Sequence, residues 1–405
     1  MKDLKHLFYF EKLLEDANNE LVREVQSKGR LALGYTCYHM PEVLLNLGNC
    51  FSVRLRAPRT GSMEMASYYM SSGSCEYSRA LLERGLEGGY HFLDALCGVD
   101  ACEAMNRAME NMELLQTKSE DKKNFFYTNL DIPCTDDEDA VAHLKEQVSR
   151  KVLKQLHEKY GVDISDKAIR DAVNKHNEVC RLFKEMDTYR HLDNPTITGY
   201  EFAVFVLASY VCPKDLIIDK LKETCEELKS RVPDKKKAYR IKAVVVGSEI
   251  DDPDLIKLFE ENGVRVVCDR YCYGSIPGRQ EIVLNNDEDA LTQVIRNYEL
   301  TTECPRQCIQ HKVKYRFEHA ANLVKEYGAD GIIYEQMKFC TYWSYERTLA
   351  SHVLRDEYHI PTLSIDRPYI SGNSGQLRTR VQAFVENVEI KKIKALRVKK
   401  ESEAK

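Results

Sequence analysis

Cysteine is the residue type in this chain with the most scope for chemistry, because the 405 residues include 14 of them. The sequence contains no Cys-x-x-Cys, and its closest pairs are Cys97/Cys102, Cys268/Cys272 and Cys304/Cys308. This spacing argues against a zinc ribbon, a rubredoxin-type site or a ferredoxin module. A metal site in this chain therefore has to be assembled from distant segments, with soft thiolates as ligands.

Cys340 has the most informative position of the cysteines. It follows an apolar segment, 331–334, that predicts a buried strand, and it precedes a helix expected to begin near Ser344. In an open α/β sheet, ligands collect at the carboxyl ends of the strands. A thiolate at such a place is a candidate ligand of a metal or a cluster. Cys75 and Cys102 lie in comparable places in the first half of the chain.

Three other cysteines, Cys180, Cys212 and Cys225, lie in helical stretches and are expected to be ordinary core or surface thiols.

The N-terminus lacks the apolar region of a signal peptide, and no stretch of 18 apolar residues predicts a membrane span. We therefore expect a cytoplasmic protein without structural disulfides, because that compartment is reducing.

Charge gives no indication of a nucleic acid or an anionic membrane as a partner. The net charge is −5, and basic and acidic residues are interspersed along the chain. The basic run at 391–400 is expected to be a solvated tail. Nucleotide motifs are missing as well, since the sequence has neither Gly-x-x-x-x-Gly-Lys-Ser/Thr nor Gly-x-Gly-x-x-Gly.

Two further segments allow either a functional or a purely structural interpretation. The Gly-rich segment 372–375, with Arg378 and Arg380 close by, either cradles an anion or is a turn that begins a helix. Pro41 is expected to begin a helix at its first position. Glu42 is then either an acid/base group near a strand end or an N-terminal glutamate favoured by the helix dipole.

The elements that must position these residues alternate between strands and helices in both halves of the chain. Residues 3–28 predict one helix. In the first half, strands are predicted at 30–35, 51–55, 92–99 and 125–127, with helices at 77–87 and 103–115. In the middle, long charged helices are predicted at 138–160, 166–187 and 198–231, with an interruption at Pro213. In the second half, strands are predicted at 241–247, 264–267, 331–334 and 362–365. The pattern predicts parallel sheets in two α/β lobes joined by helices, with domains at 1–135, 136–234 and 235–405.

Three cysteine segments carry a resemblance to a known family: 74–79, 100–107 and 338–346. They resemble the cysteine segments of the 2-hydroxyacyl-CoA dehydratase / benzoyl-CoA reductase subunit family, of the 2-hydroxyglutaryl-CoA dehydratase D-component type. Further similar segments occur in the family's order along nearly the whole chain, at 34–42, 131–133, Asn177, Arg181, 195–199 and 375–380. The resemblance implies two Rossmann-like (flavodoxin-like) lobes.

The resemblance also implies a site. In this family three cysteines from the two lobes hold a 4Fe–4S cluster, whose fourth iron is open or bound by a non-protein ligand. This role falls on Cys75, Cys102 and Cys340. The spacing from Cys75 to Cys102 is shorter than the family's, so Cys37 is the alternative first ligand. The segment after Cys102, 103–107, departs from the Asp-Gly-Lys-Lys-Lys of one branch of the family.

For function, the resemblance implies a lyase that removes water from a 2-hydroxyacyl-CoA through a ketyl radical. Its expected partners are a homologous second subunit and a separate ATP-hydrolysing iron–sulfur activator. Three alternatives stay open: a benzoyl-CoA reductase-type subunit, a homodimeric reductase with a double-cubane cluster, and a non-catalytic cluster-bearing partner subunit.

Overall fold

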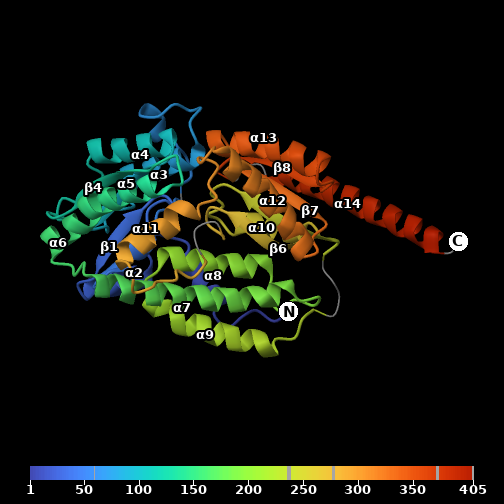
Figure 1. Cartoon of the computed structure of the whole chain (residues 1–405), viewed down its shortest axis with the longest axis horizontal. Helices are drawn as coiled ribbons and strands as arrows, with labels where there is room; N and C mark the ends of the chain where they lie inside the picture. Colours follow the sequence, from blue (N-terminus) through green and yellow to red (C-terminus); the bar gives the residue numbers. More distant parts are fainter. Residues whose placement is uncertain (59, 235–238, 276–278, 371–373, 404–405) are drawn as a thin grey trace.

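Two four-stranded parallel sheets, one in each half of the chain, form the framework of the protein (Figure 1). The computed structural model describes residues 1–405 except 59, 235–238, 276–278, 371–373 and 404–405, and it leaves the side chains of 374 and 395–403 undescribed. The first sheet has the order β2-β1-β3-β4 and the second β6-β5-β7-β8, so both repeat one topology. The predicted α/β class with two flavodoxin-like lobes is confirmed.

The strands of the first sheet are β1 (Leu31–Tyr35), β2 (Cys50–Arg54), β3 (Ala95–Asp100) and β4 (Phe126–Asp131). Those of the second are β5 (Ile241–Gly247), β6 (Val264–Tyr271), β7 (Gly331–Met337) and β8 (Thr362–Arg367). Most strand residues are buried on both faces, as in β6 and β7, which are buried throughout. Burial on both faces suits a parallel sheet that helices cover on both sides.

Helices before, between and after the strands supply that cover. In the first half they are α1 (Leu7–Leu13), α2 (Glu20–Ser27), α3 (Glu76–Leu86) and α4 (Glu103–Leu114), with short 3-10 helices η1 (Glu42–Asn46) and η2 (Ala66–Tyr68). In the second half they are α10 (Asp254–Glu261), α11 (Ala290–Leu300), α12 (Gln310–Glu326), α13 (Thr341–Asp356) and α14 (Ser374–Glu403). Helix α14 projects away from the body of the protein at its C-terminal end (Figure 1).

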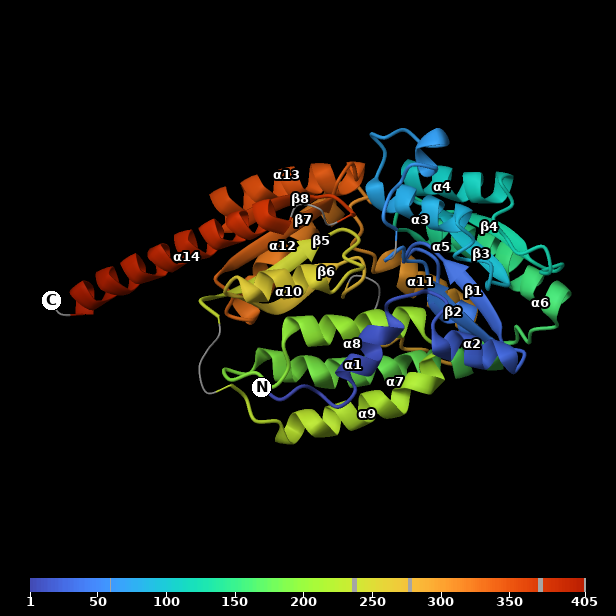
Figure 2. The ribbon, with the colours of Figure 1, turned by 180° about the vertical axis from the view of Figure 1, so that it is seen from behind.

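The middle of the chain is helical and lies along both lobes (Figure 2). It comprises α5 (Glu138–Val148), the π-helical turn η3 (Ser149–Leu153), α6 (Lys154–Tyr160), α7 (Asp166–His191), α8 (Gly199–Val211) and α9 (Lys214–Ser230). Helix α8 is buried on nearly all sides and packs against β2 and β6, which are edge strands of the two sheets. The first lobe and the second lobe therefore share one continuous core through α8.

Several predicted element boundaries were wrong in detail. The single helix expected at 3–28 is two helices, because Asn19 accepts hydrogen bonds from the N–H groups of Leu21 and Val22 and so begins α2 anew. The segment after Pro41 is a 3-10 helix and not an α-helix. The helix after Cys340 begins at Thr341, earlier than expected.

The predicted domain boundaries enclose the first sheet, the helices α5–α9 and the second sheet in turn. Helix α11 departs from this order, since it belongs to the last third of the chain but packs against α5 and α7. None of the described helices is both long and apolar enough to cross a membrane.

Candidate functional site

The strand order places a crevice at the same point in both lobes. In each sheet the order reverses between two neighbouring strands, β1 and β3 in the first and β5 and β7 in the second. Ligands of open α/β sheets bind outside the carboxyl ends of such strands. Just after these four strand ends stand Cys37, Cys102, Glu249 and Cys340.

The structure brings the three predicted ligand cysteines to one cavity of about 580 Å³. Cys75, Cys102 and Cys340 all line it, although Cys340 is far from the other two in sequence. A hydrogen bond between the thiols of Cys75 and Cys340, together with burial, raises the pKa of Cys340. Burial raises the pKa of Cys102, and charge on Cys75 would raise it further, so the three sulfurs are close neighbours.

Each of these cysteines stands at the beginning of a helix. Cys75 is the N-cap residue of α3, Cys102 of α4 and Cys340 of α13. The sulfur of Cys102 accepts a hydrogen bond from the Met105 N–H at 3.4 Å. Helix N-termini favour negative charge, and they lower the cost of a thiolate beside them. Three helix N-termini directed at one cavity therefore suit an anionic group.

The backbone holds the Cys75 and Cys340 segments against each other. The Glu76 N–H donates to the Lys338 C=O at 3.2 Å, which ties the first lobe to the loop after β7. In that loop Phe339 has a φ of 63°, in the left-handed region that non-glycine residues seldom adopt. The Cys340 N–H then donates to the Met337 C=O at 2.9 Å. This tight turn sets the direction of the Cys340 side chain.

Other groups that were not among the predicted site residues share the cavity. Glu249, Cys304 and Arg306 line it. Burial raises the pKa of Glu249 to about 7. Arg306 donates to the Pro133 C=O at 2.6 Å and so fastens the loop before α12 to the first lobe. The signal that could have identified Glu249 is its place directly after β5, the clearest strand of the sequence.

A second group of thiols lies beside the first. Cys37 and Cys304 also line the cavity, and Cys272 follows β6. Burial raises the pKa of Cys272, and negative charge on Glu249, Cys304 and Cys37 would raise it further. Burial likewise raises the pKa of Cys304 to about 12, and negative charge on Cys37 would raise it further. Cys37, Cys272 and Cys304 are therefore mutual neighbours next to the predicted ligands.

Three thiols that line one cavity are a donor set that an iron–sulfur cluster could use. Within the part of the chain that the structure describes, no three His, Cys, Asp or Glu side chains are grouped so that they could hold one metal ion. The thiols of Cys75, Cys102 and Cys340 instead surround a cavity. Such an arrangement is compatible with an iron–sulfur cluster, in which each thiolate would bind a different iron.

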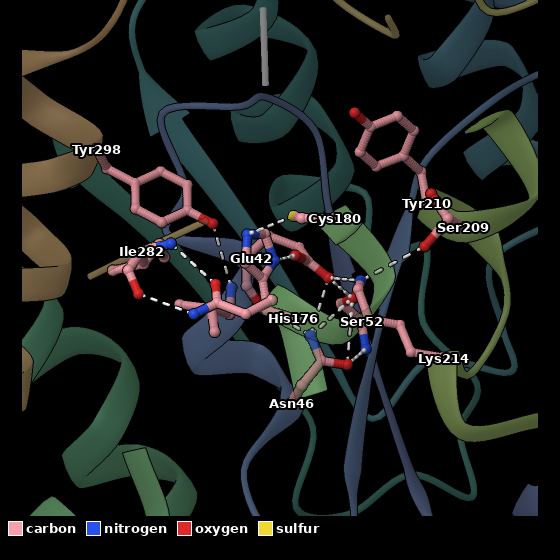
Figure 3. Close-up of polar contacts among 12 residues, drawn as sticks. Glu42, Asn46, Ser52, His176, Cys180, Ser209, Tyr210, Lys214, Ile282 and Tyr298 are labelled. Atoms are coloured by element: carbon pink, nitrogen blue, oxygen red, sulfur yellow. Dashed lines mark hydrogen bonds and ion pairs between the residues drawn. The ribbon is translucent and has the colours of Figure 1, made fainter. Parts of the chain in front are cut away.

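Glu42, the predicted acid/base residue, lies in a different place (Figure 3). It is buried and does not appear among the residues that line the cysteine cavity. Its carboxylate accepts hydrogen bonds from Lys214 and from the hydroxyl of Ser52, and it also lies 3.9 Å from the His176 imidazole. Asn46 donates to the same carboxylate at 2.9 Å. The contacts join η1, β2, α7 and α9.

The electrostatics of this group explain why Glu42 is ionised although it is buried. Burial alone would raise the pKa of its carboxyl, but the Lys214 ammonium and the His176 imidazole lower that pKa to about 2. A permanently charged carboxylate in an ion pair is a poor proton carrier near neutral pH. The contacts favour a structural role for Glu42, and its acid/base role stays a prediction.

The three cysteines predicted in helical stretches and the Gly-rich segment lie apart from the cavity or largely outside the described residues. Cys180, Cys212 and Cys225 are buried in or at the end of helices, away from the cavity lining. The proposed anion cradle at 372–375 falls largely outside the described residues.

Comparisons with known proteins agree with the resemblance. The family model of the 2-hydroxyglutaryl-CoA dehydratase D-component matches residues 37–388. The chain is 24% identical over 387 residues to the beta subunit of (R)-phenyllactyl-CoA dehydratase of Clostridium sporogenes. The matched residues cover 94% of this chain and 97% of that protein. It is 24% identical over 375 residues to subunit beta of (R)-2-hydroxyglutaryl-CoA dehydratase of Acidaminococcus fermentans, covering 91% and 95%. The lactoyl-CoA dehydratase subunit beta of Anaerotignum propionicum is 22% identical over 362 residues, covering 88% and 92%. This chain belongs to the 2-hydroxyglutaryl-CoA dehydratase D-component family.

Proposed function

We propose that this chain is the iron–sulfur subunit of a 2-hydroxyacyl-CoA dehydratase-type lyase, with a 4Fe–4S cluster held by Cys75, Cys102 and Cys340. The observation that carries the proposal is the meeting of these three thiols, from three helix N-termini and both lobes, at one cavity. The names of the relatives supply the reaction class, since each is a subunit of an acyl-CoA dehydratase.

The reaction needs an electron because the β-hydrogen of a 2-hydroxyacyl-CoA is not acidic. The thioester carbonyl takes up one electron, the α-hydroxyl leaves as hydroxide, a proton leaves the β-carbon, and the electron is returned. The sum is loss of one water, with no net oxidation or reduction. A bound cluster would supply a low-potential electron and one iron without a cysteine ligand as a Lewis acid.

The chain's own residues would bind and shield this chemistry. The helix N-termini behind the three cysteines offset the negative charge of thiolates in a buried place. Two partners complete the proposal: a homologous second subunit, as the designation of the relatives as beta subunits suggests, and an ATP-hydrolysing iron–sulfur activator as the electron donor. The chain has neither of the two common nucleotide-binding loops.

Iron and sulfide counts on anaerobically purified protein test the proposal. The wild type should hold about four irons per chain, and the Cys75→Ala, Cys102→Ala and Cys340→Ala variants should each lose the cluster. Cys225→Ala is the matched control, because Cys225 is also a buried thiol but lies in α9. Zinc without iron in the wild type, or equal loss of iron in the control, contradicts the proposal.

Activity is the second test. The iron-loaded chain should dehydrate a 2-hydroxyacyl-CoA only when the second subunit, the activator, ATP and a strong reductant are present. Turnover by the isolated chain in air contradicts this mechanism.

The second group of thiols favours one other candidate function. Cys37 and Cys304 line the same cavity as the first three cysteines, and Cys272 is a neighbour of both, so a second group of three thiols lies beside the first. A double-cubane reductase would use both groups. It predicts about eight irons per chain, a homodimer, and loss of about half the iron in Cys272→Ala and Cys304→Ala. The dehydratase proposal predicts that these two variants keep all their iron.

A further inference from the structure

Cys75 and Cys340 are closer to each other than a shared cavity alone requires. A hydrogen bond joins their two thiols. Cys75 belongs to the first lobe and Cys340 to the second, so this contact lies across the boundary between the lobes. Two thiols in contact can be oxidised to a disulfide where the backbone also permits the bond.

The backbone beside the two cysteines holds them at a suitable separation. The N–H of Glu76, the residue after Cys75, donates to the Lys338 C=O at 3.2 Å, and the side chains of Glu76 and Lys338 are paired at 3.9 Å. Cys340 lies two residues after Lys338, and its N–H closes a turn onto the Met337 C=O at 2.9 Å. A disulfide needs Cα atoms about 4.4–6.8 Å apart. Consecutive Cα atoms are about 3.8 Å apart, so cysteines one and two residues from this shared contact are within reach of such a bond.

Further contacts make the approach of the two segments a fixed feature of the fold. The Tyr369 N–H donates to the Glu76 carboxylate at 2.8 Å, and the Lys338 N–H donates to the Arg367 C=O at 2.8 Å. The beginning of α3 is therefore fastened to the segments that follow β7 and β8 in the second lobe. The contact between the thiols does not depend on long, mobile side chains.

The third cysteine of the cavity is engaged differently. The sulfur of Cys102 accepts a hydrogen bond from the Met105 N–H at 3.4 Å and so caps α4. Among the described residues, the side chains of Cys75 and Cys340 make no such bond at the beginnings of α3 and α13. The contacts therefore favour Cys75 and Cys340 as the pair of thiols that can be joined.

We propose that Cys75 and Cys340 form a reversible disulfide between the two lobes when the cluster-free chain meets a peroxide. This inference rests on the proposed function and adds a control of cluster loading by the oxidation state of the ligands. The disulfide removes two of the three proposed ligands, so the chain cannot take up a cluster until a thiol reductant restores them.

The reaction balances with hydrogen peroxide as the oxidant. Peroxide converts one thiol to a sulfenic acid and releases water, and the second thiol then condenses with that sulfur and releases a second water. The two thiols lose two electrons and the peroxide gains them. Cys340 is the more exposed of the two thiols, so it is the one that peroxide reaches first. The cavity of about 580 Å³ has room for so small an oxidant.

Peroxide treatment of the full chain, prepared reduced and without iron, tests the inference. Remaining thiols are alkylated, cross-linked peptides are identified by mass spectrometry, and circular dichroism checks that each protein is folded. The variants are Cys75→Ser and Cys340→Ser. The controls are Cys102→Ser and Cys225→Ala, since Cys102 lines the same cavity and Cys225 is a buried thiol in α9. Iron loading is measured before and after treatment with dithiothreitol.

The wild type should lose about two free thiols per chain and yield a peptide in which Cys75 is joined to Cys340. Both controls should yield the same joined peptide, whereas Cys75→Ser and Cys340→Ser should not. The oxidised wild type should bind no more iron than Cys75→Ser does. Dithiothreitol should return its iron loading to that of the reduced chain.

A wild type in which Cys102 is joined to either partner, or in which oxidation gives no cross-link, overturns the inference even when the reduced chain loads iron. A reduced wild type that binds no iron overturns the proposed function, and with it the role of the disulfide in cluster loading. In that case the joined peptide still decides whether the bond between the lobes forms.

Discussion

Replacing Lys214 by Met should destabilise the protein strongly, because it leaves the Glu42 carboxylate buried without its counter-charge. The side chains of Lys214 and Glu42 are only 10% and 9% exposed, so water cannot take over the role of the ammonium. Methionine keeps most of the length and volume of lysine. The loss can therefore be assigned to charge and not to a cavity.

The pKa of Glu42 gives the magnitude. Burial opposes ionisation, yet Lys214 and His176 bring the pKa from 4.5 to about 2. At about 1.36 kcal/mol per pKa unit, the difference of 4.5 − 2 corresponds to about 3 kcal/mol of stabilisation. Breaking a buried ion pair by removing one partner costs about 3–5 kcal/mol. Lys214→Met should lower the free energy of unfolding by a similar amount.

The sign of the pH dependence follows from the direction of the shift. The folded-state pKa of Glu42 lies below its ordinary value, so its contribution is complete above about pH 4.5 and is lost as the pH falls towards 2. The stability difference between the wild type and Glu42→Gln should therefore shrink over that interval. Above pH 5 it should be constant as far as this group is concerned.

Urea unfolding of the metal-free protein, followed by far-ultraviolet circular dichroism, measures these differences. The double variant Glu42→Gln/Lys214→Met should be more stable than Lys214→Met, because it no longer buries a lone charge. The control is Lys167→Met, which removes an ion pair to Asp171 between side chains that are 85% and 57% exposed; it should leave the unfolding midpoint unchanged. A loss below about 1 kcal/mol in Lys214→Met, or a double variant less stable than it, refutes the reasoning.

Two other substitutions should show how tightly the second lobe is built. Gly247→Ala should cost about 1–3 kcal/mol, because a Cβ at this position would lie 2.6 Å from a Glu335 carboxylate oxygen, whereas Gly61→Ala has open space and should cost little; unfolding midpoints of both compare them. Arg316→Met should cost about 3–5 kcal/mol, since Arg316 makes two hydrogen bonds, at 2.8 and 2.9 Å, to the buried Glu346 carboxylate; amide hydrogen exchange should then speed up in α12 and α13, and unchanged exchange there would contradict the assignment.

Much of the fold follows from local pattern. Apolar runs such as 241–247 predict buried parallel strands, and each predicted strand is present. The errors arose where one side chain decides the local structure. The apolar stripe of 3–28 continues across Asn19, and only the hydrogen bonds of its side chain show that α2 begins there. The position of α11 against α5 and α7 is a matter of tertiary packing, which periodicity does not contain.

The candidate site, like the fold, was predicted from the sequence only in part. The sequence segments around Cys75, Cys102 and Cys340 predicted residues that the structure brings to one cavity. Glu249 was missed because a glutamate after a strand is common, and only the structure shows that it lines the cavity of the three cysteines. Glu42 was chosen for its place near a strand end, but sequence spacing cannot show that Lys214, from a helix far along the chain, neutralises it.

The repeated strand order explains why the site lies between the lobes. Each sheet ends its two central strands at a crevice, and the two crevices contribute to one cavity. Cys102 after β3 corresponds in topology to Cys340 after β7, and Cys37 after β1 corresponds to Glu249 after β5. The lobes thus place a cysteine after both strands of one corresponding pair, and unlike residues, a cysteine and a glutamate, after the strands of the other pair. This difference gives the two sides of the cavity different side-chain chemistry, although the two sheets have the same strand order.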